Sequence, residues 1–152
     1  MKTPFFISLL GVLSSVCCIS TEEGRSVKQQ VIMEDMKLKI TIGDMVLTAT
    51  LYDNPTSRDF ISMLPVTTTL EDYASTEKIF YPDRKLSTEG APGGFDPSVG
   101  DITYYAPWGD VAIFYKDFGY ASGLISLGRI EDNGIELLRT AGVEDVTFEL
   151  VE

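Results

Sequence analysis

The sequence contains no histidine, and its only two cysteines, Cys17 and Cys18, lie close to the N-terminus. If the first twenty residues are removed on export, the remaining chain has neither residue type. That chain forms no disulfide bond, no zinc site built on Cys or His and no thiol nucleophile, and it performs no histidine acid–base chemistry. Any catalysis would therefore depend on carboxylates, Lys, Arg, Tyr or hydroxyl groups.

Basic residues are also scarce, because 12 Lys and Arg stand against 23 Asp and Glu, giving a formal net charge of −11. An acidic chain repels phosphate backbones, so nucleic acid is not expected as a partner.

Long apolar runs are confined to the N-terminus. Lys2 is followed by a segment of apolar and small residues over positions 5–20, which is typical of a secretory signal peptide over residues 1–20. The segment is shorter than the about 20 residues that a membrane-spanning helix needs. We therefore expect an exported protein, periplasmic or extracellular. A lipid anchor on Cys17 or Cys18 is the alternative to simple cleavage.

Residues 21–36 show no sustained hydrophobic period and are predicted to form a flexible leader. The segment 37–152 contains about 115 residues, which suits one domain with one hydrophobic core.

The predicted domain begins with two runs in which apolar and polar residues alternate. One run starts near Leu38 and the other at Met45, and Gly43 lies in the turn between them, so a β-hairpin is predicted. The other predicted strands are VTTTLEDY, EKIFYP, ITYYA, VAIFY, GLISLGRIE and EDVTFELVE. Closure removes exposed sheet edges, so we expect a mostly β fold, a closed eight-stranded antiparallel barrel.

Two short helices are predicted between the strands. Asn54 or Thr56 is placed to cap the first, Pro55 suits its first turn, and Pro65 ends it. The stretch NGIELLRTAG predicts the second, with Gly142 as its stop. Helices this short are suited to covering the ends of the barrel.

Four stretches resemble the cyclophilin-like domain, and in particular the small bacterial and archaeal cyclophilin-like proteins: Lys37–Pro65, Val99–Pro107, Val111–Phe118 and Ser126–Asp132. The resemblance implies a closed eight-stranded barrel with a helix at each open end.

The resemblance also implies a catalytic candidate. Cyclophilins that act as peptidyl-prolyl isomerases set an arginine from a Phe-His-Arg pattern beside a hydrophobic proline pocket. Its hydrogen bond to the proline nitrogen weakens the amide resonance behind a barrier of about 18–20 kcal/mol. Here Phe80 is followed by Tyr81 and Pro82, and the nearest arginine is Arg84. Arg84 is therefore the one candidate for a divergent peptidyl-prolyl cis-trans isomerase.

Aromatic residues are concentrated between positions 80 and 120. Alternation along a strand sends Tyr104 and Tyr105 to opposite faces, and likewise Phe114 and Tyr115, so one ring of each pair can wall an outer cleft. The candidate ligand-binding residues are Tyr81, Arg84, Phe95, Tyr105, Trp108 and Phe114. They predict a non-catalytic binding module for a small apolar molecule or an extended, proline-containing peptide, with no cofactor.

Two further roles are considered for charged residues, one for Arg129 and one for carboxylates in or near the Gly-rich segment 87–101. We expect Arg129 to pair with Glu131 or Asp132 rather than to bind a ligand. A calcium site is the alternative role for three carboxylates near this segment: Asp96, Asp101 and Asp110. No twelve-residue calcium loop is present, so no metal site is predicted.

Overall fold

The structure is a computed structural model, and it describes residues 36–142 and 145–151. The predicted signal peptide and nearly all of the predicted leader lie outside these residues. The described strands and helices are β1 (Met36–Ile42), β2 (Met45–Leu51), α1 (Pro55–Ile61), β3 (Val66–Thr69), β4 (Glu71–Tyr73), β5 (Glu77–Phe80), β6 (Gly94–Phe95), β7 (Asp101–Tyr105), β8 (Asp110–Phe114), β9 (Ala121–Ser122), β10 (Leu124–Ile130), α2 (Gly134–Thr140) and β11 (Asp145–Leu150).

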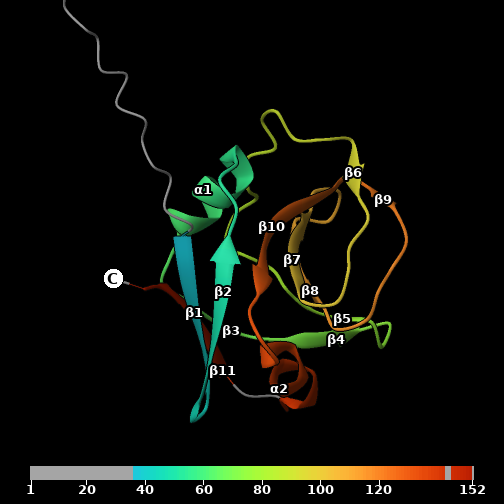
Figure 1. Cartoon of the computed structure of the whole chain (residues 1–152). Coiled ribbons are helices and arrows are strands. Elements are labelled where there is room, and N and C mark those ends of the chain that lie inside the picture. The colour runs from blue at the N-terminus through green and yellow to red at the C-terminus, as the bar shows by residue number, and fades with distance from the viewer. Residues whose placement is uncertain (1–35, 143–144, 152) are drawn as a thin grey trace, which may run out of the picture. The chain divides into compact units, whose positions relative to one another are not determined.

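Nine strands form one antiparallel sheet in the order β3-β11-β1-β2-β10-β7-β8-β5-β4. The first and last strands of this order, β3 and β4, are separated along the chain by Leu70 alone. The polypeptide itself therefore joins the two edges, and the sheet curls into the nearly closed barrel seen in Figure 1. The predicted mostly β, barrel-shaped fold is confirmed.

The predicted number of eight strands is too low for two reasons. VTTTLEDY was expected to form one strand, but Leu70 turns its side chain into the core and divides the segment into β3 and β4. The short strands β6 and β9 pair in a separate two-stranded sheet, where the sequence favoured loops.

The barrel core follows the predicted alternation. Leu38, Ile40 and Ile42 on β1 are fully buried, and the intervening residues are partly exposed. Two aromatic rings from distant parts of the chain meet at the centre: those of Phe80 and Phe148 stack with centroids 5.0 Å apart. Such contacts between distant segments hold the strands around a single core.

The two helices lie at opposite ends of β2, as Figure 1 shows. Asn54 caps α1, because its side-chain oxygen accepts a hydrogen bond of 2.9 Å from the backbone N–H of Ser57. Phe60 of α1 and Leu138 of α2 are fully buried, so each helix contributes an apolar side chain to the core.

Candidate ligand-binding site

The two faces of β8 have different roles. Val111 and Ile113 point into the barrel core and are fully buried. The alternate residues Asp110, Ala112 and Phe114 point to the outer face, because successive side chains of a strand lie on opposite sides. The neighbouring strands continue this outer face, since Glu77 of β5 pairs with Phe114, and Tyr105 of β7 pairs with Asp110.

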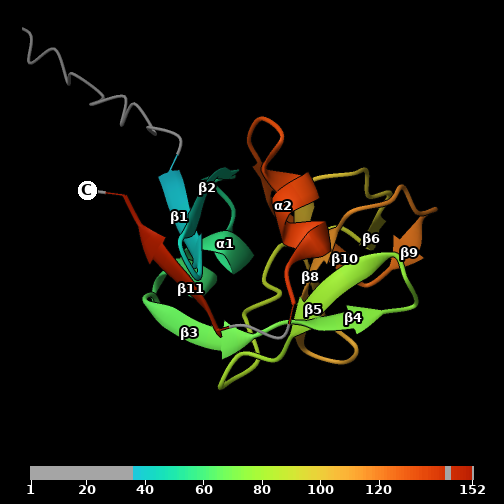
Figure 2. The same ribbon diagram turned by 90° about the horizontal axis from the view of Figure 1, so that it is seen from below.

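A second, smaller apolar cluster covers the outer face at this point. Its buried members are Ile79, Ala112, Phe114 and Leu124, and Phe95, Tyr105 and Ala121 pack against them. Figure 2 shows β4 and β5 beside β8, on the side of the barrel that also carries β6 and β9. The small β6–β9 sheet thus lies over part of the outer face.

A cavity of about 270 Å³ opens beside this cluster. It is lined by Tyr73, Ala74, Thr76, Glu77, Ile79, Tyr105, Trp108, Asp110, Ala112, Phe114, Phe118, Ala121 and Leu124. The described lining contains neither Lys nor Arg. Its charged side chains are those of Glu77 and Asp110, and both are acidic.

Aromatic rings form the walls. Trp108, in the turn between β7 and β8, meets Tyr73 and Tyr105 edge to face, with ring centroids 5.5 Å away in each case. Phe114 and Phe118 stack with their centroids 6.2 Å apart. Trp108 and Phe118 are about half exposed, so apolar ring surface faces the opening.

Glu77 and Asp110 give the cavity its charge, and neither was predicted as a ligand-binding residue. Asp110 was considered only as a calcium ligand. Asp110 is only 2% exposed, and its Oδ1 has no hydrogen-bond partner within the described residues. Burial raises the pKa of Asp110 above its usual range. Burial, together with the nearby charge of Asp110, raises the pKa of Glu77 from 4.5 to about 7.

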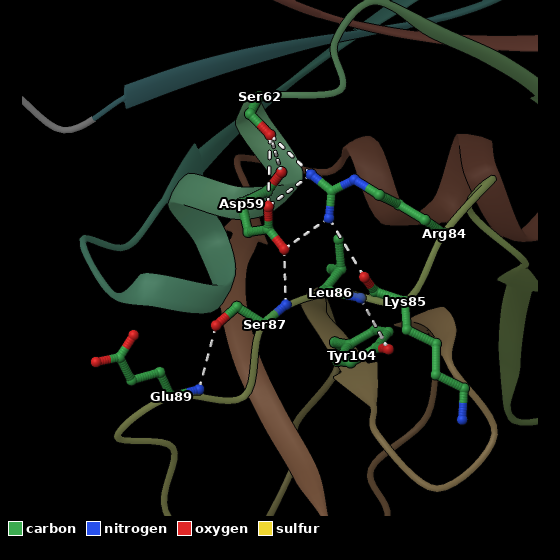
Figure 3. Close-up of polar contacts among 8 residues, drawn as sticks. All are labelled: Asp59, Ser62, Arg84, Lys85, Leu86, Ser87, Glu89 and Tyr104. Atoms are coloured by element: carbon green, nitrogen blue, oxygen red, sulfur yellow. Dashed lines mark hydrogen bonds and ion pairs between the residues drawn. The ribbon is translucent and has the colours of Figure 1, made fainter.

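Arg84 lies away from this cavity, in the network of Figure 3. Its Nη2 donates to Asp59 Oδ1 at 2.6 Å, and its Nη1 donates to Asp59 Oδ2 at 2.8 Å. The backbone N–H of Ser87 also donates to Asp59 Oδ2, at 2.7 Å. The Arg84 guanidinium is the main reason that the pKa of Asp59 falls to about 2, and it holds the segment after β5 against α1.

The six candidate ligand-binding residues therefore separate into groups. Tyr105, Trp108 and Phe114 line the cavity together. Phe95 packs against the same apolar cluster without lining the cavity. Tyr81 and Arg84 line a different depression, because the chain leaves the sheet after Phe80 and runs toward α1.

The match to known families agrees with this architecture. A family model described as the cyclophilin-like family matches residues 40–149. The chain belongs to the cyclophilin-like family. Its fold is also similar to that of a hypothetical protein from Archaeoglobus fulgidus, determined in solution, with a TM-score of 0.55 and 21% sequence identity over 77% of this chain and 95% of that one. A search of curated proteins gave no significant match.

The carboxylates of this cyclophilin-like domain do not gather in the way that the calcium alternative required. Asp101 Oδ1 accepts a hydrogen bond of 2.7 Å from Arg129, and its Oδ2 accepts one of 2.8 Å from the backbone N–H of Ser98. Asp110 instead lines the cavity. The described residues contain no group of three carboxylates, cysteines or histidines placed to hold a metal ion.

The same ion pair corrects the expectation for Arg129. This arginine pairs with Asp101 on the neighbouring strand rather than with Glu131 or Asp132, because the β7–β10 register places Asp101 directly opposite it. Glu131 pairs with Lys37 instead. Within the described part of the cyclophilin-like chain, no helix is long and apolar enough to cross a membrane.

Proposed function

We propose that this domain binds a small, largely apolar molecule in the aromatic cavity and performs no covalent chemistry on it. The observation that carries the proposal is the position of the cavity. Its floor is the outer face of β5, β7 and β8, and its walls are the rings of Tyr73, Trp108 and Phe118. Rigid strands with aromatic walls and few polar groups are typical of small-molecule sites.

The size of the cavity limits the ligand. Its volume of about 270 Å³ is somewhat below the about 300–1,000 Å³ of most ligand sites and exceeds the about 150 Å³ of a cavity that holds benzene. A molecule of one or two rings, or an equivalent aliphatic group, fits this volume. A single side chain of a peptide would also fit, so the test includes one.

Binding can be measured through Trp108, the only tryptophan of the chain, by its fluorescence and in parallel by calorimetry. The probes are small aromatic molecules that are neutral, cationic or anionic, and a proline-containing tetrapeptide. Ala121→Phe, which fills the cavity edge, is expected to abolish binding. Tyr81→Ala removes an exposed ring outside the cavity and is expected to leave binding unchanged. The proposal fails if no small probe binds, or if Ala121→Phe binds as the wild type does.

Export is a separate part of the proposal, and it is supported by the apolar segment within residues 1–20. The mass of the mature chain, purified from cells that express the full sequence, tests it. A chain cut near residue 20 indicates a released protein, and a lipid on Cys17 or Cys18 indicates an envelope anchor. A chain that retains residues 1–20 contradicts export by a cleaved signal.

A further inference from the structure

Two acidic side chains, Glu77 and Asp110, line a cavity whose remaining surface is mainly apolar. Among the ion pairs within residues 36–142 and 145–151, none involves Glu77 or Asp110. Asp110 is 2% exposed and lines the cavity, and its Oδ1, which is itself buried, has no hydrogen-bond partner in these residues. A buried carboxylate oxygen without a donor is costly to the fold, so a donor or a positive charge supplied from outside to this carboxylate would relieve part of that cost.

The surroundings narrow the chemistry of that donor. A calcium ion takes six to eight oxygen ligands, and the remaining surface beside the two carboxylates is mainly apolar, so it suits a metal ion poorly. An anion would be repelled by both carboxylates. An organic cation is favoured by the carboxylates and by the faces of Tyr73, Tyr105 and Trp108, since aromatic faces attract cations.

We infer that the ligand is a primary or secondary ammonium ion on a small apolar or aromatic body, with its N–H groups donating to Asp110 and Glu77. The inference rests on the proposed function and names the class of ligand for the same cavity. An ammonium that carries N–H bonds can donate to the carboxylates of Asp110 and Glu77 that line the cavity, whereas a quaternary ammonium has the charge but no hydrogen to donate.

The titratable groups around the two carboxylates are few. On the strands that pack against β5, the cavity side carries Tyr73 from β4 and Asp110 from β8; β7, the other neighbour of β8, adds Tyr105. Lys78, the other charged residue of β5, forms an ion pair with Asp72 of β4 at 3.3 Å. Asp72 also accepts a hydrogen bond of 2.7 Å from the hydroxyl group of Tyr115.

An ammonium ligand requires Glu77 to be ionised, so its binding releases a proton. Because the pKa of Glu77 is raised to about 7, near pH 7 this group releases a fraction of a proton for each ligand bound. A neutral ligand of the same shape does not require ionisation and releases none. Calorimetry in two buffers with different ionisation enthalpies measures this number directly.

The experiment compares 2-phenylethylamine with 2-phenylethanol, propylbenzene and the quaternary trimethyl derivative of the amine. We expect the amine to bind about tenfold or more tightly than either the alcohol or the quaternary derivative, and to release protons on binding, which the two neutral compounds should not do. Glu77→Gln and Asp110→Asn should each remove about tenfold from the amine affinity and leave the alcohol affinity unchanged. Circular dichroism shows whether each variant is folded. If Asp110→Asn does not fold, the comparison is made with Glu77→Gln alone.

The outcomes separate the two proposals. Binding of the alcohol or the hydrocarbon as tightly as the amine overturns the ammonium inference and leaves the apolar site intact. Equal binding of the amine and its quaternary derivative also overturns it, because the N–H donors then contribute nothing. If none of the four compounds binds, the proposed function itself fails.

Discussion

Glu77→Gln is expected to stabilise the empty protein above pH 7. In the folded state burial and Asp110 raise the pKa of Glu77 to about 7, whereas its ordinary value is 4.5. Below the ordinary value both the folded and the unfolded state hold the proton, and Glu77 costs the fold nothing. As the pH rises, the unfolded state releases the proton first, so the free energy of unfolding falls until the pH has passed the folded-state pKa.

The size of the effect follows from the same shift. At 1.36 kcal/mol per pH unit, the rise from 4.5 to about 7 sets an upper limit of about 3 kcal/mol. Glu77 is only partly buried, so solvent screening reduces this to on the order of 1–2 kcal/mol. Glutamine has nearly the same shape and no charge. The variant should therefore match the wild type near pH 4 and exceed its stability by that amount near pH 8.

Urea unfolding followed by circular dichroism at a series of pH values measures the difference. Glu71→Gln serves as the control, because Glu71 is exposed on the adjacent strand β4 outside the cavity and loses the same charge. A Glu77→Gln protein that is no more stable than the wild type at pH 8 would refute the reasoning. So would a gain that is equally large at pH 4.

Three other substitutions test separate parts of the structure. Arg129→Ala leaves the buried carboxylate of Asp101 without its ion pair and should lower the free energy of unfolding by about 1–3 kcal/mol in urea titrations; an unchanged midpoint contradicts this. A β-carbon at Gly94 would collide with the Ala121 carbonyl oxygen, so Gly94→Ala should displace β9 and weaken binding in the cavity severalfold. Gly119→Ala, whose β-carbon has nothing within 4 Å, should leave the affinity unchanged, and equal affinities of the two variants contradict this. The domain should not accelerate isomerisation of a proline-containing tetrapeptide, and an acceleration that disappears in Arg84→Ala would establish the alternative activity.

Period-two alternation was sufficient to predict much of the barrel. It places Leu38, Ile40 and Ile42 in the core, and it sends Tyr104 inward and Tyr105 outward. Local chemistry also limited the cap of α1 to Asn54 or Thr56, and the structure shows that Asn54 is the cap. These are features that depend on residues adjacent in the sequence.

The acidic part of the cavity could not be predicted in the same way. The predicted strand VAIFY began at Val111, and one additional residue of strand was enough to place Asp110 on the same face as Ala112 and Phe114. Glu77 was predicted only as the polar first residue of the strand EKIFYP. Its position opposite Phe114 is set by the pairing of β5 with β8, between segments more than thirty residues apart, which no local pattern specifies.

The placement of Arg84 failed for a related reason. The sequence brought Arg84 and Tyr81 near the aromatic residues because all lie within one Gly-rich and aromatic region. In the structure, Arg84 donates two hydrogen bonds to Asp59 of α1, and the segment with Tyr81 and Arg84 lies on another part of the surface. Asp59 and Arg84 are 25 positions apart in the sequence, so no local sequence pattern predicts that they form an ion pair.

Glu77 connects the stability of this domain with its proposed ligand. A structural carboxylate stabilises the fold, so its removal lowers stability or leaves it unchanged. A carboxylate retained for a ligand has the opposite effect, because the empty protein bears the cost of its burial until the ligand arrives. Glu77→Gln should therefore raise the stability of the empty protein above pH 7 and lower its affinity for an ammonium ligand. Two measurements that move in opposite directions would exclude a general loss of structure as the cause of weaker binding, whereas Arg129→Ala should change stability alone.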